Sequence, residues 1–345
     1  MPDQYKIAIV GASSLRGKEL NEALTESPFA NADFVLMDEE DQIGQLESVG
    51  DEMTFVQRID PTSFERADFV FFADSEESTQ KYWKIAQRAG ASIVDMTAGI
   101  EGEAGVLVRA PWVQDHSEDV GETPGLATAA VVPAHPVAVA VGLLTQRLEQ
   151  VGALRCASVT VLEPASEYGR EAMDELHQQT VNLLNFQTLP KSIYDTQVAF
   201  TATPVFGEAG KFRLPEREAR IRRHYAALRG VAPVVPLQLI HTPVFHGYGL
   251  SMSIEFADPV ALEHVEAALQ GEHVDVIMGD SDAPTNLSSA GQGDVLVRVR
   301  TADGSQEKTS QFWVWAALDN LRIASLNAVA CAMELQRLRP RGKVQ

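Results

Sequence analysis

The sequence predicts an α/β protein of two domains, a doubly wound parallel sheet followed by an α+β domain with a mixed or mostly antiparallel sheet. Strand and helix patterns alternate in the N-terminal part of the chain, which is typical of a parallel sheet covered on both faces. Farther along, strands tend to follow strands directly. The length of 345 residues also suits two domains better than one core.

The N-terminal elements begin with KIAIV, whose β-branched residues predict a short strand. A tight turn at Gly11 and an amphipathic helix starting near Leu15 follow. FVLMDE and ADFVFFAD repeat the strand pattern. KYWKIAQRAG then predicts a helix that ends at Gly90, and Ser92–Met96 is a fourth strand. This alternation predicts parallel strands with helices on both faces.

The C-terminal elements follow a different order. A strand is predicted for LRCASVTVLEP and a long helix for Gly169–Asn185. Two further strands are predicted for LQLIHTPVF and LSMSIEF. A hairpin is predicted for DVLVRVR and QFWVWAAL, which are joined through ADGS. We therefore place residues 1–130 and 322–345 in the first domain and residues 131–321 in the second. The last helix then packs on the first domain. We expect disorder at residues 115–123 and 339–345.

Composition narrows the range of partners. Acidic residues outnumber basic ones 48 to 28, for a net charge of −20, so nucleic acid and anionic membranes are unfavourable partners. No apolar run reaches the length needed to span a bilayer. The cysteines, Cys156 and Cys331, fall in apolar stretches and are expected to be small buried side chains without a disulfide. These features predict a cytoplasmic protein.

The turn GASSLRG after the first strand has features of a dinucleotide-binding turn. Gly11 would permit the tight turn and Gly17 close packing of helix on strand, while the amides at the start of the helix would face a phosphate. Ser14 brings a side chain to a position where glycine would let pyrophosphate approach the backbone. The candidate cofactor contacts here are Gly11, Ser13, Ser14, Leu15 and Gly17. A tight turn that holds no ligand is the alternative.

The end of the second strand, MDEEDQIG, is acidic. A 2′-phosphate would meet the carboxylates of Asp38, Glu39, Glu40 and Asp41, with no arginine or lysine among them, so NAD is favoured over NADP if either binds. Asp38 is the expected acceptor for a ribose hydroxyl. A solvated acidic loop is the alternative, and whether any cofactor binds stays open.

Four stretches, in this order, resemble the aspartate-semialdehyde dehydrogenase family: GASSLRGKEL, IVDMTAG, LEPASEYGREAMDEL and DNLRIASLNAVACAMEL. The resemblance extends over essentially the whole chain and is closest to a divergent branch of Usg-like homologues. It implies an N-terminal Rossmann domain completed by the C-terminal helix, and a larger α+β domain that forms a homodimer. It also implies reduction of aspartyl phosphate with NADPH through a cysteine thioester, and cofactor contacts at Ser166 and Asn320.

The matching catalytic positions depart from the family pattern. The family's cysteine turn corresponds to VPAH, which places His135 at the nucleophile position. In HTPVFHGYGLS, His241 stands at the position of a substrate arginine and Tyr248 at that of the acid–base histidine. Glu163 corresponds to a substrate-orienting glutamine, and Glu101 to a second arginine.

The same side chains suggest two further interpretations, a metal site and a hydrogen-bonded filling of the cleft. His135, His241 and His246 beside Glu163 could form a metal site, but the spacing within HTPVFH is not a metal signature. We expect instead that these histidines and Tyr248 fill the cleft and hydrogen-bond one another.

Two stretches outside these positions have simpler interpretations. The charge run EREARIRR, residues 216–223, is interpreted as a solvated helix start behind Pro215. Trp313 and Trp315 share one face of a strand and predict a sheet or dimer surface.

These substitutions predict a homologue that keeps the family's fold and dimer but not its reaction, and acts as a scaffold or regulator. Losing the nucleophile removes the covalent route, and replacing arginine by glutamate reverses the sign of its interaction with phosphate. One alternative is an NAD-linked oxidoreductase with another substrate, in which His135 or Tyr248 donates a proton. In a third hypothesis the protein keeps the family's activity, and a residue at a displaced position takes over the lost catalytic role.

Overall fold

The computed structural model describes residues 4–39, 43–50, 52–114, 123–230, 234–279, 281–304 and 308–338. The segments expected to be disordered, except Thr123, and Glu40 and Asp41 of the acidic loop lie outside this range. The chain divides into two compact units, Met1–Ala134 with Ala324–Gln345, and His135–Ile323.

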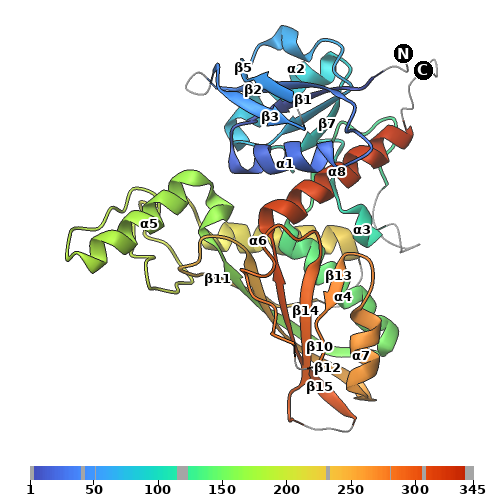
Figure 1. Ribbon diagram of the computed structural model, residues 1–345. Coiled ribbons are helices and arrows are strands. Elements are labelled where there is room, and N and C mark those ends of the chain that lie inside the picture. The colour runs from blue at the N-terminus through green and yellow to red at the C-terminus, as the bar shows by residue number, and fades with distance from the viewer. Residues whose placement is uncertain are drawn as a thin grey trace. The chain divides into compact units, whose positions relative to one another are not determined.

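The first unit is built on a seven-stranded sheet of order β5-β2-β1-β6-β7-β9-β8, in which each pair of neighbouring strands is parallel (Figure 1). Its strands are β1 (Lys6–Val10), β2 (Asp33–Asp38), β5 (Gln57–Arg58), β6 (Phe69–Phe72), β7 (Ser92–Asp95), β8 (Val106–Arg109) and β9 (Ala130–Pro133). A separate hairpin joins β3 (Leu46–Val49) and β4 (Glu52–Phe55).

Alternating side chains of β1 and β6 enter two different cores. Ile7 and Phe71 belong to one cluster with residues of α1 (Leu15–Thr25) and of α8 (Asn320–Leu338). Val10 and Phe72 belong to a second cluster, with Trp83 and Ala86 of α2 (Glu76–Arg88). Helices therefore cover both faces of this sheet, and α8 supplies part of the core. The short α3 (Pro111–Gln114) follows β8.

The second unit is built on a six-stranded mixed sheet of order β11-β10-β12-β15-β14-β13. Its strands are β10 (Leu154–Glu163), β11 (Leu237–His241), β12 (Tyr248–Val260), β13 (Val274–Val276), β14 (Val295–Thr301) and β15 (Thr309–Leu318). The central pairs are antiparallel, whereas β10–β11 and β13–β14 are parallel. Its helices are α4 (Pro136–Val151), α5 (Arg170–Leu184), α6 (Leu214–Arg229) and α7 (Leu262–Leu269).

The predicted fold class is confirmed by both sheets. Along β15, buried Phe312, Val314 and Ala316 alternate with the more exposed Trp313 and Trp315. The two tryptophans therefore share one face of the strand, as expected.

The prediction that both cysteines are buried is confirmed for Cys331 and wrong for Cys156. Cys331 is buried in α8, but Cys156 is exposed on β10. The register with β12 shifts between Leu154 and Cys156, and this irregularity at the start of the strand accompanies the exposed side chain.

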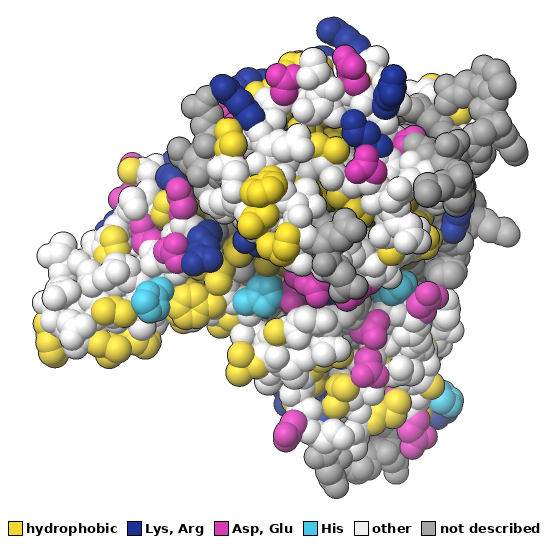
Figure 2. All heavy atoms as spheres, turned by 45° about the horizontal axis from the view of Figure 1, so that its top comes forward, with side chains coloured by type: hydrophobic (Ala, Val, Ile, Leu, Met, Phe, Trp, Pro, Cys, Tyr) yellow, Lys and Arg dark blue, Asp and Glu magenta, His cyan; other side chains and the backbone are white. Residues whose placement is uncertain are grey.

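No helix among the described residues is both long and apolar enough to cross a membrane. On the face shown in Figure 2, acidic and basic side chains are interspersed.

Candidate functional site

Two glycines shape the turn between β1 and α1. Gly11 has φ +83°, and a Cβ placed on it would lie 2.3 Å from the Cβ of Asp74. A Cβ on Gly17 would lie 2.0 Å from the carbonyl oxygen of Gly11. Both positions thus require glycine, the first for its backbone conformation as well as for space.

Ser14 caps helix α1 with its own side chain. Its Oγ accepts a hydrogen bond from the amide of Gly17 at 2.9 Å and donates one to the carbonyl of Gly11 at 2.8 Å. These two hydrogen bonds of the Ser14 hydroxyl are therefore made within the turn. The amides of Leu15 and Arg16, in the first turn of the helix, have no intrahelical acceptor, and such amides can face an anion.

Carboxylates surround this turn. Asp38 is 6% exposed, and its Oδ2 accepts from the amide of Ser13 at 2.9 Å. Burial, together with the negative charge of Asp38, raises the pKa of Asp74. The local charge is therefore unfavourable for an additional phosphate, such as that of NADP.

Glu101 lies in the turn after β7, also in the first unit. Its amide donates to the carbonyl of Ala98 at 3.4 Å. The turn is organised by the fully buried Asp95, whose carboxylate accepts from the amides of Thr97 and Ile100.

The second unit gathers Glu163, Tyr168, Tyr248 and His241 at the ends of β10 and β11 and the start of β12. Glu163 has no exposed surface, and its Oε2 accepts from the hydroxyl of Tyr168 at 2.7 Å. Its Oε1 lies 3.5 Å from the hydroxyl of Tyr248. Three of the residues selected from the sequence, Glu163, Tyr248 and His241, thus converge, and Tyr168 joins them.

Arg217 contradicts the interpretation of residues 216–223 as a solvated helix start. Its side chain is 17% exposed, and its Nη1 lies 2.6 Å from Oε1 of Glu167. Its Nε lies 3.5 Å from Oε1 of Glu163, and its guanidinium carbon is 4.4 Å from the ring centre of Tyr168. Helix α6 thus places the guanidinium of Arg217 next to the carboxylates of Glu163 and Glu167.

Burial and neighbouring charges determine the protonation states of Tyr168, Tyr248 and Arg217. Burial and the charge of Glu163 raise the pKa of Tyr168 well above its usual value, and burial with Glu167 and Glu163 does the same for Tyr248. Burial alone would lower the pKa of Arg217, but attraction from the carboxylates of Glu167 and Glu163 raises it. Both phenols therefore stay protonated near neutral pH, and the guanidinium stays charged.

His135 is the N-cap of helix α4. Its Nδ1 accepts a hydrogen bond from the amide of Val137 at 3.2 Å, and its own amide donates to Nδ1 of His224 at 2.9 Å. Because Nδ1 accepts, the ring proton is on Nε2, which faces Oε1 of Glu167 at 3.5 Å. The imidazole lone pair is used for capping, which leaves no free nitrogen for nucleophilic attack.

His241 occupies an aromatic enclosure. Its ring centre is 5.0 Å from that of Tyr194 and 5.1 Å from that of Phe206. Neither ring nitrogen has a hydrogen-bond partner, and Nδ1 is 3.7 Å from Oε2 of Glu163. The expected hydrogen bonds among the histidines and Tyr248 are therefore wrong. Tyr248 instead hydrogen-bonds Glu163, and its ring centre lies 5.9 Å from that of His135 in an edge-on arrangement. His135 at the head of α4, His241 on β11 and Tyr248 on β12 are fixed on separate elements.

Ser166 and Asn320 form a second network that includes His246. Ser166 Oγ donates to Oδ1 of Asn320 at 3.1 Å and lies 3.1 Å from Nδ1 of His246. His246 Nε2 is 2.8 Å from Oδ2 of Asp319. Both ring nitrogens of His246 are thus engaged by Ser166 and Asp319. Among the described residues, no group of three or more His, Cys, Asp or Glu side chains is arranged to hold a metal.

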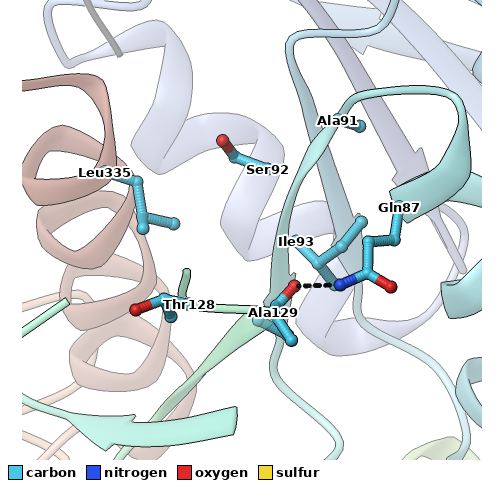
Figure 3. Close-up of a pocket in the computed structure, with 8 residues that line it drawn as sticks. Gln87, Ala91, Ser92, Ile93, Thr128, Ala129 and Leu335 are labelled. Atoms are coloured by element: carbon cyan, nitrogen blue, oxygen red, sulfur yellow. Dashed lines mark hydrogen bonds between the residues drawn. The ribbon is translucent and has the colours of Figure 1, made fainter. Parts of the chain in front are cut away.

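A cavity of about 80 Å³ in the first unit does not coincide with these groups. Figure 3 shows its lining, where the Gln87 amide donates to the carbonyl of Ala129 at 3.3 Å. Its side chains are neutral, and none belongs to the dinucleotide-type turn. Its lining includes no acidic, basic or histidine side chain.

The capping role of His135 leads to a stability prediction. His135→Ala should lower the free energy of unfolding by about 1 kcal/mol more than His135→Asn, because asparagine can still cap α4. Urea denaturation monitored by circular dichroism measures the difference. Equal losses in the two variants would mean that the imidazole does not stabilise the helix as a cap.

The sequence interpretation missed Arg217, Glu167 and Tyr168. A helical signal for Arg217 was present, since Ile221 and Leu228, four and eleven positions farther along α6, are both buried. Glu167 and Tyr168 lie in the 3₁₀ helix Ala165–Tyr168, where periodicity gives no comparable signal.

Comparison with known families gives two matches. Residues 6–120 match the semialdehyde dehydrogenase NAD binding domain, and residues 146–323 match the semialdehyde dehydrogenase dimerisation domain.

Individual proteins are similar over nearly their whole length. An aspartate-semialdehyde dehydrogenase of Rickettsia bellii is 24% identical over 339 residues, covering 97% of this chain and 98% of that protein. A USG-1 protein homolog of Pseudomonas aeruginosa is 29% identical over 336 residues, covering 95% and 97%. The structure of a probable aspartate-semialdehyde dehydrogenase from Pseudomonas aeruginosa matches with a TM-score of 0.84 at 25% identity, covering 98% of this chain and 99% of that one.

Proposed function

This chain belongs to the semialdehyde dehydrogenase family, and we propose that within it the protein has lost the family's reaction and acts as a dimeric scaffold or regulator. The observation that carries the proposal is His135. At the head of α4, where the family resemblance places a reactive cysteine, the side chain is an imidazole whose Nδ1 is engaged as a helix cap. Without a nucleophile here, a thioester cannot form at this position.

Neither cysteine offers a substitute nucleophile. Cys331 is buried in the core of the first unit, and Cys156 lies near the start of β10, whereas Glu163 ends that strand. Both are free thiols, which supports a cytoplasmic location as part of the proposal.

The charges around Glu163 also oppose an anionic substrate. Glu163 and Glu167 place two carboxylates beside the single guanidinium of Arg217. The cation is thus already compensated, and a further carboxylate or phosphate would meet net negative charge.

The dimer is proposed from the second unit. Trp313 is 38% exposed on a sheet face that also carries Trp315. Leu184, Phe186 and Phe200 are more than half exposed on α5 and the segment after it, a lobe on which Figure 2 shows hydrophobic side chains. Together with the family's dimerisation domain, these apolar surfaces favour self-association.

The alternative is an NAD-dependent oxidoreductase with another substrate. It is favoured by the match to an NAD binding domain, and by Asp38 at the end of β2, where an acidic residue can accept from a ribose hydroxyl of NAD. In this alternative the protonated Tyr248 would be the proton donor.

Calorimetric titration with NAD⁺, NADH and NADP⁺ separates the two functions. For a scaffold we expect no saturable binding at millimolar cofactor. Saturable binding of NAD⁺ by wild type would contradict the scaffold and favour the oxidoreductase.

A further inference from the structure

Donors from separate elements meet at the carboxylate of Glu167. Arg217 of α6 approaches its Oε1 at 2.6 Å, and His135 at the head of α4 points Nε2 toward the same oxygen at 3.5 Å. Asn320, at the start of α8, donates from Nδ2 to Oε2 at 3.4 Å. A guanidinium, an imidazole N–H and an amide are all donors that can hydrogen-bond a free carboxylate.

The arrangement is largely closed to solvent. The side chains of Glu167 and His135 are each 7% exposed, and Asn320 is 1% exposed. His135 Nε2 is buried without a hydrogen-bond partner although it faces the carboxylate. A buried donor of this kind contributes stability only if an anion or water stays next to it.

The two glutamates beside Arg217 differ in how they are held. Glu163 ends a ten-residue strand, has no exposed surface and is fixed by the Tyr168 hydroxyl. Glu167 belongs to a four-residue 3₁₀ helix that is followed by Gly169 at φ +83°. The Glu167 side chain therefore reaches the donors from a short turn rather than from the sheet.

We propose that Glu167 is an internal occupant of a binding site for small monocarboxylates, and that it keeps free anions out of this site. Beyond Cβ, a glutamate side chain has the composition of acetate. Removing that portion leaves a space of matching size beside Arg217, His135 and Asn320. The inference rests on the proposed loss of the family's reaction, and it assigns the exclusion of free anions from the site to one side chain.

The test uses acetate as the probe and the full-length Glu167→Ala variant. We expect acetate to raise the melting temperature of this variant in a saturable manner, with millimolar affinity by calorimetry. Wild type should show no saturable response at the same ionic strength, set with sodium chloride. Acetamide, which has the same shape without the charge, should have no effect on either protein.

Glu171→Ala is the matched control. Glu171 is an exposed glutamate only four positions away that pairs with Lys211 at 2.7 Å, and its removal should give no acetate response. If Glu167→Ala is unfolded in acetate-free buffer, acetate but not acetamide should restore its native circular dichroism.

Three results would overturn the proposal: Glu167→Ala unresponsive to acetate, equal responses to acetate and acetamide, or saturable acetate binding by wild type. The measurement does not involve turnover. Dehydrogenase activity in wild type would therefore contradict the proposed function while leaving the acetate result to decide this inference.

Discussion

Replacing Arg217 by methionine is expected to lower the free energy of unfolding by about 3–5 kcal/mol, the cost of breaking a buried ion pair by removing one partner. Methionine keeps much of the volume over the Tyr168 ring but leaves Glu163 and Glu167 without their cation. Chemical denaturation of wild type and variant measures the loss.

Arg222→Met on the same helix is the control for Arg217→Met. Arg222 is 52% exposed and pairs with Glu218 one turn away, so its loss should cost at most about 0.5 kcal/mol. Adding Glu163→Gln and Glu167→Gln to Arg217→Met should recover most of the stability, because no buried charge is then left unpaired. A loss as small as that of Arg222→Met would contradict the buried ion pairs.

Gly11→Ala is expected to be destabilising by about 2–5 kcal/mol, combining the cost of a left-handed backbone with that of overpacking. The new Cβ would lie 2.3 Å from the Cβ and 2.7 Å from the backbone nitrogen of Asp74, so β1 and the end of β6 would have to separate.

Gly44→Ala separates the two causes of that loss. Gly44 has a similar φ of +81°, but nothing lies within 4 Å of a Cβ placed on it, so only the backbone cost of about 1–2 kcal/mol remains. Urea denaturation of both variants measures the difference. Equal losses would mean that the close contact between Gly11 and Asp74 does not constrain the turn.

The fold could be predicted because local signals agreed with one another. The alternation of strands and helices fixed the class of the first sheet, and the expected helix Gly169–Asn185 corresponds to α5 with its N-cap at Gly169 and its C-cap at Asn185. Glycine at a helix boundary and a regular apolar spacing are both visible in a single sequence.

The interactions of the site could be predicted only in part. Glu163, His241 and Tyr248 were expected to come close to one another, but their partners depend on residues far away in sequence. Whether Arg217 faces water or Glu167, fifty positions earlier, is decided by how α6 packs, and the general tendency of charge runs to be solvated gave the wrong answer.

The role of His135 was equally inaccessible from sequence, because histidine is not a common N-cap. Only the geometry reveals that its Nδ1 accepts from the amide of Val137.

The most direct test of the lost reaction is an assay of wild type and His135→Cys with aspartate semialdehyde, inorganic phosphate and NAD⁺ or NADP⁺. Because Glu163 and Glu167 compensate Arg217, restoring a thiol alone should not restore turnover. We expect cofactor reduction in both proteins to stay at the level of a heat-treated control. Sustained phosphate-dependent reduction by wild type would contradict the proposal that this site no longer performs the family's reaction. Reduction by His135→Cys alone would contradict the account of the charges around Arg217.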